Sequence, residues 1–346
     1  MRAVVIREPG GPEVLEVRDV PTPLLSPEHV RVQVAFAGVN RADLLQRMGL
    51  YPAPPGVPPD IPGLEYAGAV SAIGAGVTRF APGDRVLGIV GGGAYAEEIV
   101  VHEREVVHTP PILADEDAAA LPEAFLTAWD ALVVRGRLQP GERVLIHAVG
   151  SGVGTAAAQL ASALGCQVIG TSRTAEKLER ARRLGLDVGI VVDKARFAHE
   201  VRHVTGGHGA DVVVDLVGGA YVPETIFACA PRARVVLVGL TAGRIAEIDL
   251  ALVLRNRIEI IGTVLRSRPL EEKIEAARML ERSVLPLFVK KSLRPVIDQV
   301  YGLSDVARAH DRVAGNATFG KVLLRVQEGE RPTVPGLDPY TRPTIS

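Results

Sequence analysis

The sequence predicts an α/β protein, in which a doubly wound parallel sheet is combined with a β-rich domain. From residue 122 onward, short apolar stretches alternate with amphipathic ones, which is the order of repeated βαβ units. The apolar stretches contain few polar positions, as expected for strands that helices cover on both faces. The first 121 residues instead show short strand patterns separated by Gly and Pro.

The N-terminal part contains strands and one long irregular loop. Residues 30–39, "VRVQVAFAGV", alternate apolar and polar side chains, which predicts a half-buried strand. Residues 51–63, "YPAPPGVPPDIPG", are too rich in proline for regular structure. Further strands are expected at 83–90 and 94–101. Together these segments predict a barrel-like domain whose loops can carry a site.

The sequence pattern changes from strands to a helix at residues 122–138. Pro122 stands at the first position of this predicted helix and Gly136 near its end. Six strands are then expected at 143–149, 167–172, 189–192, 211–217, 234–240 and 258–265, with helices at 152–165, 175–185 and 197–206. A long helix at about 269–289, a strand, a helix at 304–315 and a strand at 320–326 follow. We expect these last elements to return to the first domain.

Composition excludes several classes of function. The chain has 346 residues, is 47% hydrophobic and 23% charged, and has a net charge of -1. It therefore lacks the basic character of proteins that bind nucleic acid or anionic membranes. Two cysteines, Cys166 and Cys229, cannot build a disulfide framework or a cysteine zinc site. With no apolar signal core or membrane-length apolar run, the expected setting is the cytoplasm.

A glycine-rich turn joins the first parallel strand to its helix. The strand at 143–149 runs directly into "GSGVGTAAAQLA". Ala148, Ser151 and Gly154 form an A-x-x-S-x-x-G pattern, with Gly152 between them, in place of the strict G-x-G-x-x-G spacing. Such a turn, at the start of a βαβ series, predicts that backbone N–H groups bind a dinucleotide pyrophosphate.

The end of the second parallel strand indicates which dinucleotide binds. Ser172 and Arg173 stand there, Lys177 follows one helical turn later, and no carboxylate is present to bind a ribose 2′-hydroxyl. A hydroxyl, a guanidinium and an ammonium suit a 2′-phosphate. The pattern favours NADPH over NADH. The alternative is that Arg173 and Lys177 are only solvent-exposed residues at the start of a helix.

With these motifs, the chain resembles the zinc-free quinone oxidoreductases, the zeta-crystallin type of the medium-chain dehydrogenase/reductases, and in particular their stress-induced branch. The resemblance covers the chain from Met1 to about Val326 and includes "GVNRADLLQRMGLY", "PPDIPGLEYAGAV", "LPEAFLTAWDAL" and "LRSR". It implies a Rossmann domain at 122–265 and a GroES-like domain formed by 1–121 and 266–328. Residues 329–346 are polar and rich in proline, which predicts a C-terminal tail that is disordered or lies over the surface.

The resemblance also bears on metal binding. Zinc-dependent members of the superfamily carry ligands at the positions of Ala37 and Leu64, neither of which can bind a metal, so a zinc-free enzyme is expected. An H-E-x-x-H pattern formed by His199, Glu200 and His203, with Glu224 downstream, is typical of zinc peptidases. Because it falls between the third and fourth parallel strands, we interpret it as a surface helix with two solvated histidines.

The resemblance assigns roles to individual residues. Asn40 would lie beside the nicotinamide and the acceptor oxygen, although it also suits a helix N-cap. Tyr51 would bind the quinone oxygen and deliver a proton, or else anchor its loop. Thr127 would contact the nicotinamide side, or bond its own helix backbone. The expected cofactor-binding set is Asn40, Thr127, Ser151, Gly152, Val153, Gly154, Ser172, Arg173, Lys177, Gly239, Leu240, Leu265, Arg266, Ser267 and Lys321.

One departure from the family concerns cofactor selectivity. The family commonly has a Tyr at the end of the third parallel strand, near the 2′-phosphate, where this chain has Val192 followed by Asp193. A carboxylate near a phosphate is unfavourable, so a weaker preference for NADPH is expected.

The sequence as a whole predicts an NADPH-dependent reductase that passes hydride to a quinone or a conjugated carbonyl. Two alternatives are an enoyl or alkenal reductase on the same fold and a non-catalytic NADPH-binding protein, structural or RNA-binding. The expected partners are a small-molecule substrate and a second copy of the chain, without nucleic acid or membrane. The homodimer is expected because the apolar strand at 258–265 would be an open sheet edge.

Overall fold

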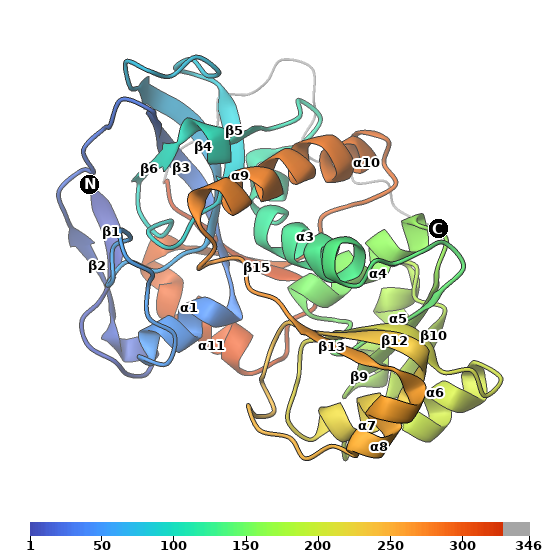
Figure 1. The fold of residues 1–346 in the computed structure, drawn as a ribbon. Helices are drawn as coiled ribbons and strands as arrows, with labels where there is room; N and C mark the ends of the chain where they lie inside the picture. The colour runs from blue at the N-terminus through green and yellow to red at the C-terminus, as the bar shows by residue number, and fades with distance from the viewer. Residues whose placement is uncertain (328–346) are drawn as a thin grey trace.

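Two large sheets, joined by a continuous apolar core, organise the chain (Figure 1). The structure, a computed structural model, describes residues 1–327. The expected tail at 329–346 lies outside the described residues. One hydrophobic cluster contains Leu87 of the first sheet, Phe125 of the helix between the sheets and Ile146 of the second sheet. Burial of this surface therefore fixes the two sheets against each other.

The second sheet has six parallel strands and confirms the doubly wound α/β prediction. Its order is β10-β9-β8-β11-β12-β13, so the chain starts in the middle and builds outward to both sides. The strands are β8 (Arg143–Ile146), β9 (Gln167–Ser172), β10 (Val188–Val191), β11 (Ala210–Asp215), β12 (Cys229–Leu237) and β13 (Glu259–Gly262). The crossover helices are α4 (Gly152–Ala163), α5 (Ala175–Arg182), α6 (Ala198–Val204), α7 (Tyr221–Ala228) and α8 (Leu250–Asn256). Ligands of such sheets bind at the carboxyl ends, where the order reverses between β8 and β11.

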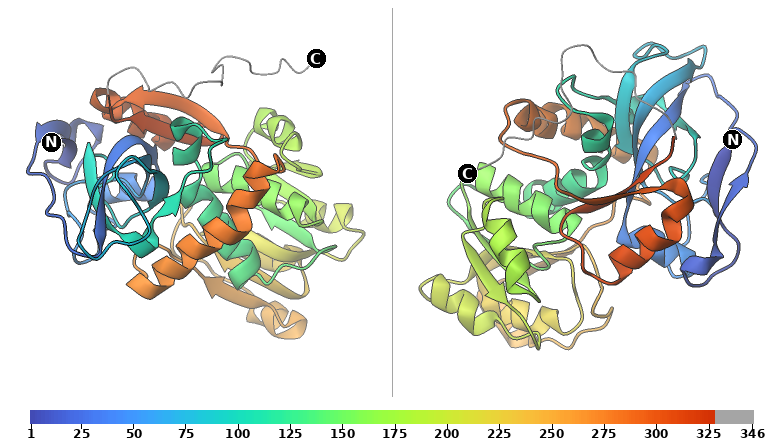
Figure 2. Two further views of the ribbon diagram at one scale, coloured as in Figure 1. Left: turned by 90° about the horizontal axis from the view of Figure 1, so that it is seen from above. Right: turned by 180° about the vertical axis from the view of Figure 1, so that it is seen from behind.

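The first sheet combines the N-terminal strands with two strands from the end of the chain. Its order is β14-β15-β3-β4-β5-β7, with β6 also paired to β3. The strands are β3 (His29–Val39), β4 (Glu65–Ile73), β5 (Arg85–Ile89), β6 (Glu98–His102), β7 (Val107–His108), β14 (Ile297–Gly302) and β15 (Lys321–Arg325). Seen from behind, β14 and β15 lie between the blue strands and the green helices (Figure 2). On this arrangement we propose the domain boundaries expected above.

The remaining elements close the first sheet and connect the two units. They are the hairpin β1 (Arg2–Ile6) and β2 (Leu15–Asp19), the helices α1 (Arg41–Arg47), α2 (Asp115–Ala119), α3 (Pro122–Trp129), α9 (Leu270–Met279), α10 (Leu285–Val289) and α11 (Val306–Ala314). Two helices predicted as single elements change geometry. The one at 122–138 turns π-helical at Asp130–Arg135, and the one at 269–289 does so at Leu280–Val284. Pro286 lies in the first turn of α10, and because proline lacks an N–H donor it explains the second break.

Candidate cofactor and active site

The glycine turn between β8 and α4 adopts the conformation that its sequence requires. Ser151 is the N-cap of α4, and its Oγ accepts a hydrogen bond from the N–H of Gly154 at 3.0 Å. A Cβ at Gly154 would stand 2.4 Å from the carbonyl oxygen of Ala148, so only glycine fits there. The first N–H groups of α4 therefore lie at the carboxyl end of the sheet, where a pyrophosphate binds in such folds.

The start of β15 lies against this turn and links the two units. Gly320 N–H donates to the Gly150 carbonyl at 3.0 Å, and Gly320 also forms a bridge with Ser151. A Cβ at Gly152 would stand 2.7 Å from Cδ of Lys321, so the lysine side chain runs along the turn. The expected cofactor residues Ser151, Gly152 and Lys321 are thus brought together.

The end of that lysine enters a buried polar cluster. Lys321 Nζ lies 2.6 Å from Glu65 Oε1, and both side chains are almost completely buried. Asn40 joins them, because its Oδ1 accepts from Lys321 at 2.5 Å and its Nδ2 donates to Glu65 Oε1 at 2.9 Å. The other carboxylate oxygen of Glu65 accepts the N–H of Glu123 at 2.8 Å. Glu65 was not among the predicted site residues, although it directly follows Leu64 in the "GLE" triplet.

Asn40 occupies the N-cap position of α1 and forms a capping box with Asp43, in which each side chain pairs with the backbone N–H of the other residue. The Asp43 carboxylate accepts the N–H of Asn40 at 2.7 Å, and the amide of Asn40 also bonds to Glu65 and Lys321. Asp43 also accepts from Gly63 N–H and from the Tyr95 hydroxyl. Burial nevertheless raises the pKa of Asp43 to about 6. The N-cap expectation thus holds, and the same amide also takes part in the polar cluster.

Tyr51 and Arg266 form a second contact pair. The Arg266 guanidinium lies 5.0 Å from the centre of the Tyr51 ring and donates to the Tyr51 carbonyl at 3.1 Å. It also donates to the Gly91 carbonyl and to Gln46 Oε1. Arg266 thereby holds the proline-rich loop in place. Burial raises the pKa of the Tyr51 phenol, which therefore keeps its proton at neutral pH.

A pocket of about 440 Å³ lies beside the end of β9, and cations dominate its lining. Arg173, Lys177 and Arg180 contribute from one unit, and Gly315, Asn316 and Ala317 contribute from the other, with Thr174 and Glu176 completing the lining. Lys177 Nζ donates to the Asn316 carbonyl at 2.6 Å. Burial, followed by the nearby charge of Arg173, lowers the pKa of Lys177. A cluster of cations that repel one another is suited to bind an anion such as the 2′-phosphate of NADPH.

The two residues by which this chain departs from the expected pattern at the third parallel strand lie outside the pocket. Val192 is buried in a hydrophobic cluster, and Asp193 is exposed and does not line the pocket. Of the other expected cofactor residues, Thr127 lies on α3 and Val153 on α4, and the rest lie at or after the carboxyl ends of β9, β12 and β13. Ser172, Thr127 and Leu265 are buried, Gly239 is half-buried, and Leu240 and Ser267 are exposed. Val153 follows Gly152 in the first turn of α4 and is half-buried.

The H-E-x-x-H pattern lies on α6, and the surface-helix prediction is confirmed. His199 and His203 are both exposed. The Glu224 carboxylate accepts the N–H groups of Phe197 and Ala198 at 3.0 and 2.9 Å, so it caps the start of this helix. Within residues 1–327, no group of three or more His, Cys, Asp or Glu side chains is arranged to hold a metal ion. None of the helices in that range has the length and apolar character needed to cross a membrane.

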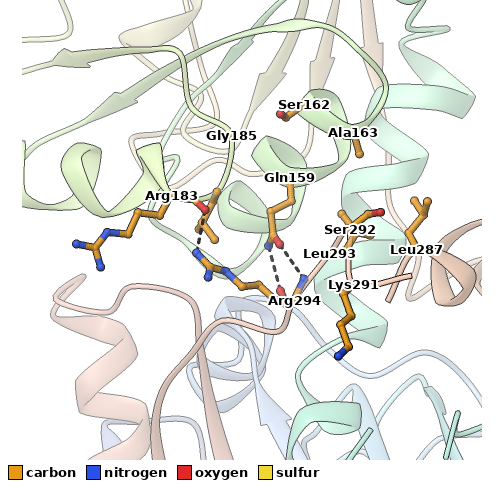
Figure 3. A pocket seen from close by; sticks show the side chains of 11 residues that line it. Gln159, Ser162, Ala163, Arg183, Gly185, Leu287, Lys291, Ser292, Leu293 and Arg294 are labelled. Carbon is orange, nitrogen blue, oxygen red and sulfur yellow. Dashed lines mark hydrogen bonds between the residues drawn. The ribbon is translucent and has the colours of Figure 1, made fainter. Parts of the chain in front are cut away.

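A second pocket, of about 430 Å³, contains none of the predicted site residues (Figure 3). It lies where α4 meets the segment after α10. Gln159 exchanges two hydrogen bonds with the backbone of Arg294, at 2.9 and 3.1 Å. Arg294 also donates to the Arg183 carbonyl at 2.8 Å. These contacts make it a junction between the two units.

Comparisons with known proteins agree with this architecture. Residues 26–111 match the family described as alcohol dehydrogenase GroES-like domain, and residues 152–282 match the family described as zinc-binding dehydrogenase. The chain is 36% identical to a quinone oxidoreductase of Pseudomonas aeruginosa over 323 residues, which cover 91% of this chain and 96% of that protein.

Solved structures are similar over nearly the whole chain. An NAD-dependent alcohol dehydrogenase is 35% identical with a TM-score of 0.82, covering 94% of this chain and 100% of the other. The Escherichia coli quinone oxidoreductase complexed with NADPH is 29% identical with a TM-score of 0.83, and coverage is again 94% and 100%. The CurK enoyl reductase is 27% identical with a TM-score of 0.82, covering 94% and 98%.

Proposed function

Because this chain belongs to the quinone oxidoreductase type of the medium-chain dehydrogenase/reductase superfamily, we propose that it is an NADPH-dependent reductase of quinones or conjugated carbonyls that works without a metal. The observation that carries the proposal is the cationic pocket of Arg173, Lys177 and Arg180 at the carboxyl end of the parallel sheet. It lies next to the glycine turn, so one bound dinucleotide can reach both.

Different groups of residues would hold the different parts of NADPH. Ser151, Gly152, Val153 and Gly154 offer the backbone of the turn to the pyrophosphate, and Arg173 and Lys177 offer charge to the 2′-phosphate. When bound, the cofactor supplies the hydride. The protein then positions the acceptor, excludes water and provides a proton. Tyr51 keeps its phenolic proton in a half-buried position, so its hydroxyl can donate a hydrogen bond to the acceptor oxygen.

A metal-free reaction is expected from the two positions that hold zinc ligands in related enzymes. Ala37 and Leu64 are both buried, with exposed fractions of 0% and 2%. Their alkyl side chains offer no lone pair to a metal. We therefore expect the purified protein to contain no stoichiometric zinc in elemental analysis. One tightly bound zinc per chain would contradict this prediction.

The proposal is tested by NADPH oxidation with a panel of quinones and conjugated enones. Turnover with quinones supports the proposal as stated. Turnover with enones only, and reduction of the C=C bond in the product, would make the chain an enoyl or alkenal reductase, the alternative that its similarity to the CurK enoyl reductase favours. Binding of NADPH without turnover of any acceptor would contradict both.

A further inference from the structure

We propose that Glu123 is the acid that gives a proton to the substrate as it is reduced, an inference that rests on the function proposed above. Glu123 follows Pro122 at the start of α3, the helix that lies between the two sheets. Sequence reasoning assigned it no role, although it stands in the "PEAFLTA" motif.

The carboxyl group of Glu123 differs from that of Glu65 in its hydrogen bonding. Glu65 receives three donors, from Lys321, Asn40 and the backbone N–H of Glu123 itself. The carboxyl group of Glu123 has no hydrogen-bond or ion-pair partner among residues 1–327. Its side chain is half-buried, so water or a substrate can reach it. The neighbouring donors are thus already bonded to Glu65, and the carboxyl group of Glu123 remains available to hydrogen-bond a ligand.

Charged groups of both signs surround the carboxyl group of Glu123. Glu65 on β4 and Asp43 on α1 face it with negative charge, whereas Lys321 on β15 and Arg266 after β13 face it with positive charge. Lys321 already forms an ion pair with Glu65 at 2.6 Å, and Arg266 already donates a hydrogen bond to the Tyr51 carbonyl in the proline-rich loop. Burial and the Glu65 charge therefore outweigh the cations and raise the pKa of Glu123 to about 8. Glu123 is thus a carboxylic acid at neutral pH.

Two proton-bearing groups, Glu123 and Tyr51, lie near the proline-rich loop. Glu123 and Tyr51 lie close enough to influence each other electrostatically. Burial raises the pKa of Tyr51 above its ordinary value near 10, whereas that of Glu123 lies near the working pH. Because general acids are most effective when their pKa is near the working pH, Glu123 is the better donor. Tyr51 then orients the acceptor through its hydroxyl.

The chemical step balances with these groups. The substrate gains two electrons and one proton as a hydride, which leaves negative charge on its oxygen, or on the enolate of a conjugated carbonyl. The O–H bond of Glu123 breaks and a new O–H or C–H bond forms on the substrate. Glu123 is left as a carboxylate, and solvent at its exposed side returns the proton before the next turnover.

The experiment compares Glu123→Gln with Glu275→Gln, which makes the same change at an exposed position on α9. Infrared difference spectra of the wild type against Glu123→Gln should show a protonated carboxyl band at pH 7 that disappears with a midpoint at about pH 8. In the wild type, kcat/KM should fall as pH rises through the same range. Glu123→Gln should lose about 100-fold or more in kcat/KM and lose that pH dependence.

Controls separate the possible outcomes. NADPH affinity should be unchanged in Glu123→Gln, Glu275→Gln should behave as wild type, and Glu123→Asp should keep part of the activity and the high-pH decline. An active wild type with an equally active Glu123→Gln, or a wild type without the infrared band at pH 7, overturns the inference alone. A wild type that reduces no acceptor overturns the proposed function, and the inference falls with it.

Discussion

At the scale of single residues, the buried Glu65–Lys321 pair shows how the site is held together. Removing both charges from water is costly, and only good geometry and additional hydrogen bonds offset that cost. The structure provides both, since the two charged atoms are 2.6 Å apart and Asn40 bonds to each side chain. The pair therefore stabilises the fold only while both members are present.

We predict that Lys321→Met lowers the free energy of unfolding by about 3–5 kcal/mol, because it leaves a buried carboxylate uncompensated. The double variant Glu65→Leu with Lys321→Met should recover most of this loss. Urea denaturation measures both, with the exposed Lys290→Met as the control. A double variant as unstable as Lys321→Met would show that the loss comes from packing of the lysine stem.

Cofactor selectivity is a second property of single residues. Arg173→Ala and Lys177→Ala should each weaken NADPH use about 10- to 150-fold, since a charge-assisted hydrogen bond contributes about 1.5–3 kcal/mol. NADH lacks the phosphate and should change little. Asp193→Asn should strengthen NADPH use modestly, by removing a negative charge at the end of β10. The measurement is kcat/KM with both cofactors, and the exposed Arg282→Ala is the control.

An equal loss with NADH and NADPH would mean that Arg173 and Lys177 support the fold and do not bind the phosphate. A wild type that prefers NADH would show the cofactor proposal itself to be wrong.

At the scale of elements, His147 connects three parts of the nucleotide-binding sheet. It follows β8, its Nδ1 lies 3.0 Å from the Thr171 hydroxyl on β9, and its Nε2 lies 2.8 Å from the Thr225 hydroxyl on α7. Burial lowers the pKa of His147 to about 4, although the charge of Asp215 opposes the shift. Protonation would leave the imidazole without an acceptor nitrogen and place a charge in the core.

Stability should therefore depend on pH with a definite sign. The unfolded chain takes up a proton on His147 near pH 6.5, and the folded chain does so only near pH 4. The contribution to stability is complete above the unfolded pKa and is lost as pH falls from about 6.5 to about 4, at about 1.4 kcal/mol per pH unit. Buried His310, with its pKa lowered to about 3, adds a similar dependence.

Denaturant unfolding at pH 4.5–7 measures this slope. His147→Phe should lower stability at pH 7, because two threonine hydroxyls lose their partner, and should also reduce the slope by about 1.4 kcal/mol per pH unit. The exposed His199→Phe on α6 is the control and should keep the slope of the wild type. A slope unchanged in His147→Phe would mean that His147 titrates normally.

At the scale of the whole molecule, the two edges of the parallel sheet differ. The strands β10 and β13 end the order of the sheet, so each has one side without a partner strand in the described part of the chain. Near β13 the surface is apolar, because Ile260, Leu250 and Leu254 are all exposed. An exposed apolar edge pairs readily with a copy of itself across a two-fold axis. On this basis we propose a homodimer that joins the β13 edges.

Ile260→Lys should convert this dimer to a monomer, because it places a like charge on both sides of the two-fold axis. Sedimentation at micromolar concentration measures the change. Val191→Lys, an equivalent exposed position on the opposite edge strand β10, is the control and should remain dimeric. A monomeric wild type would contradict the proposal.

Elements whose signals are local can be predicted from the sequence alone. Apolar runs between glycine-rich turns gave all six parallel strands, and Ser151 and Gly154 marked the first crossover helix, because capping and turn geometry act within a few residues. The crossover helices α7 and α8 were missed. Each has only seven or eight residues, and Pro223 in the first turn of α7 weakens the helical pattern.

Which side chains meet at the site depends on the packing of elements that are distant in the sequence. Asn40 and Lys321 are 281 residues apart, and their hydrogen bond exists because β15 returns to pair with β3. The pKa of Glu123, at the start of α3, is raised because packing partly removes the carboxyl group from water and places Glu65 beside it on β4. A pKa depends on desolvation and on neighbouring charges, and both are properties of the packed molecule. For that reason the sequence pointed to Tyr51, and only the fold revealed Glu123.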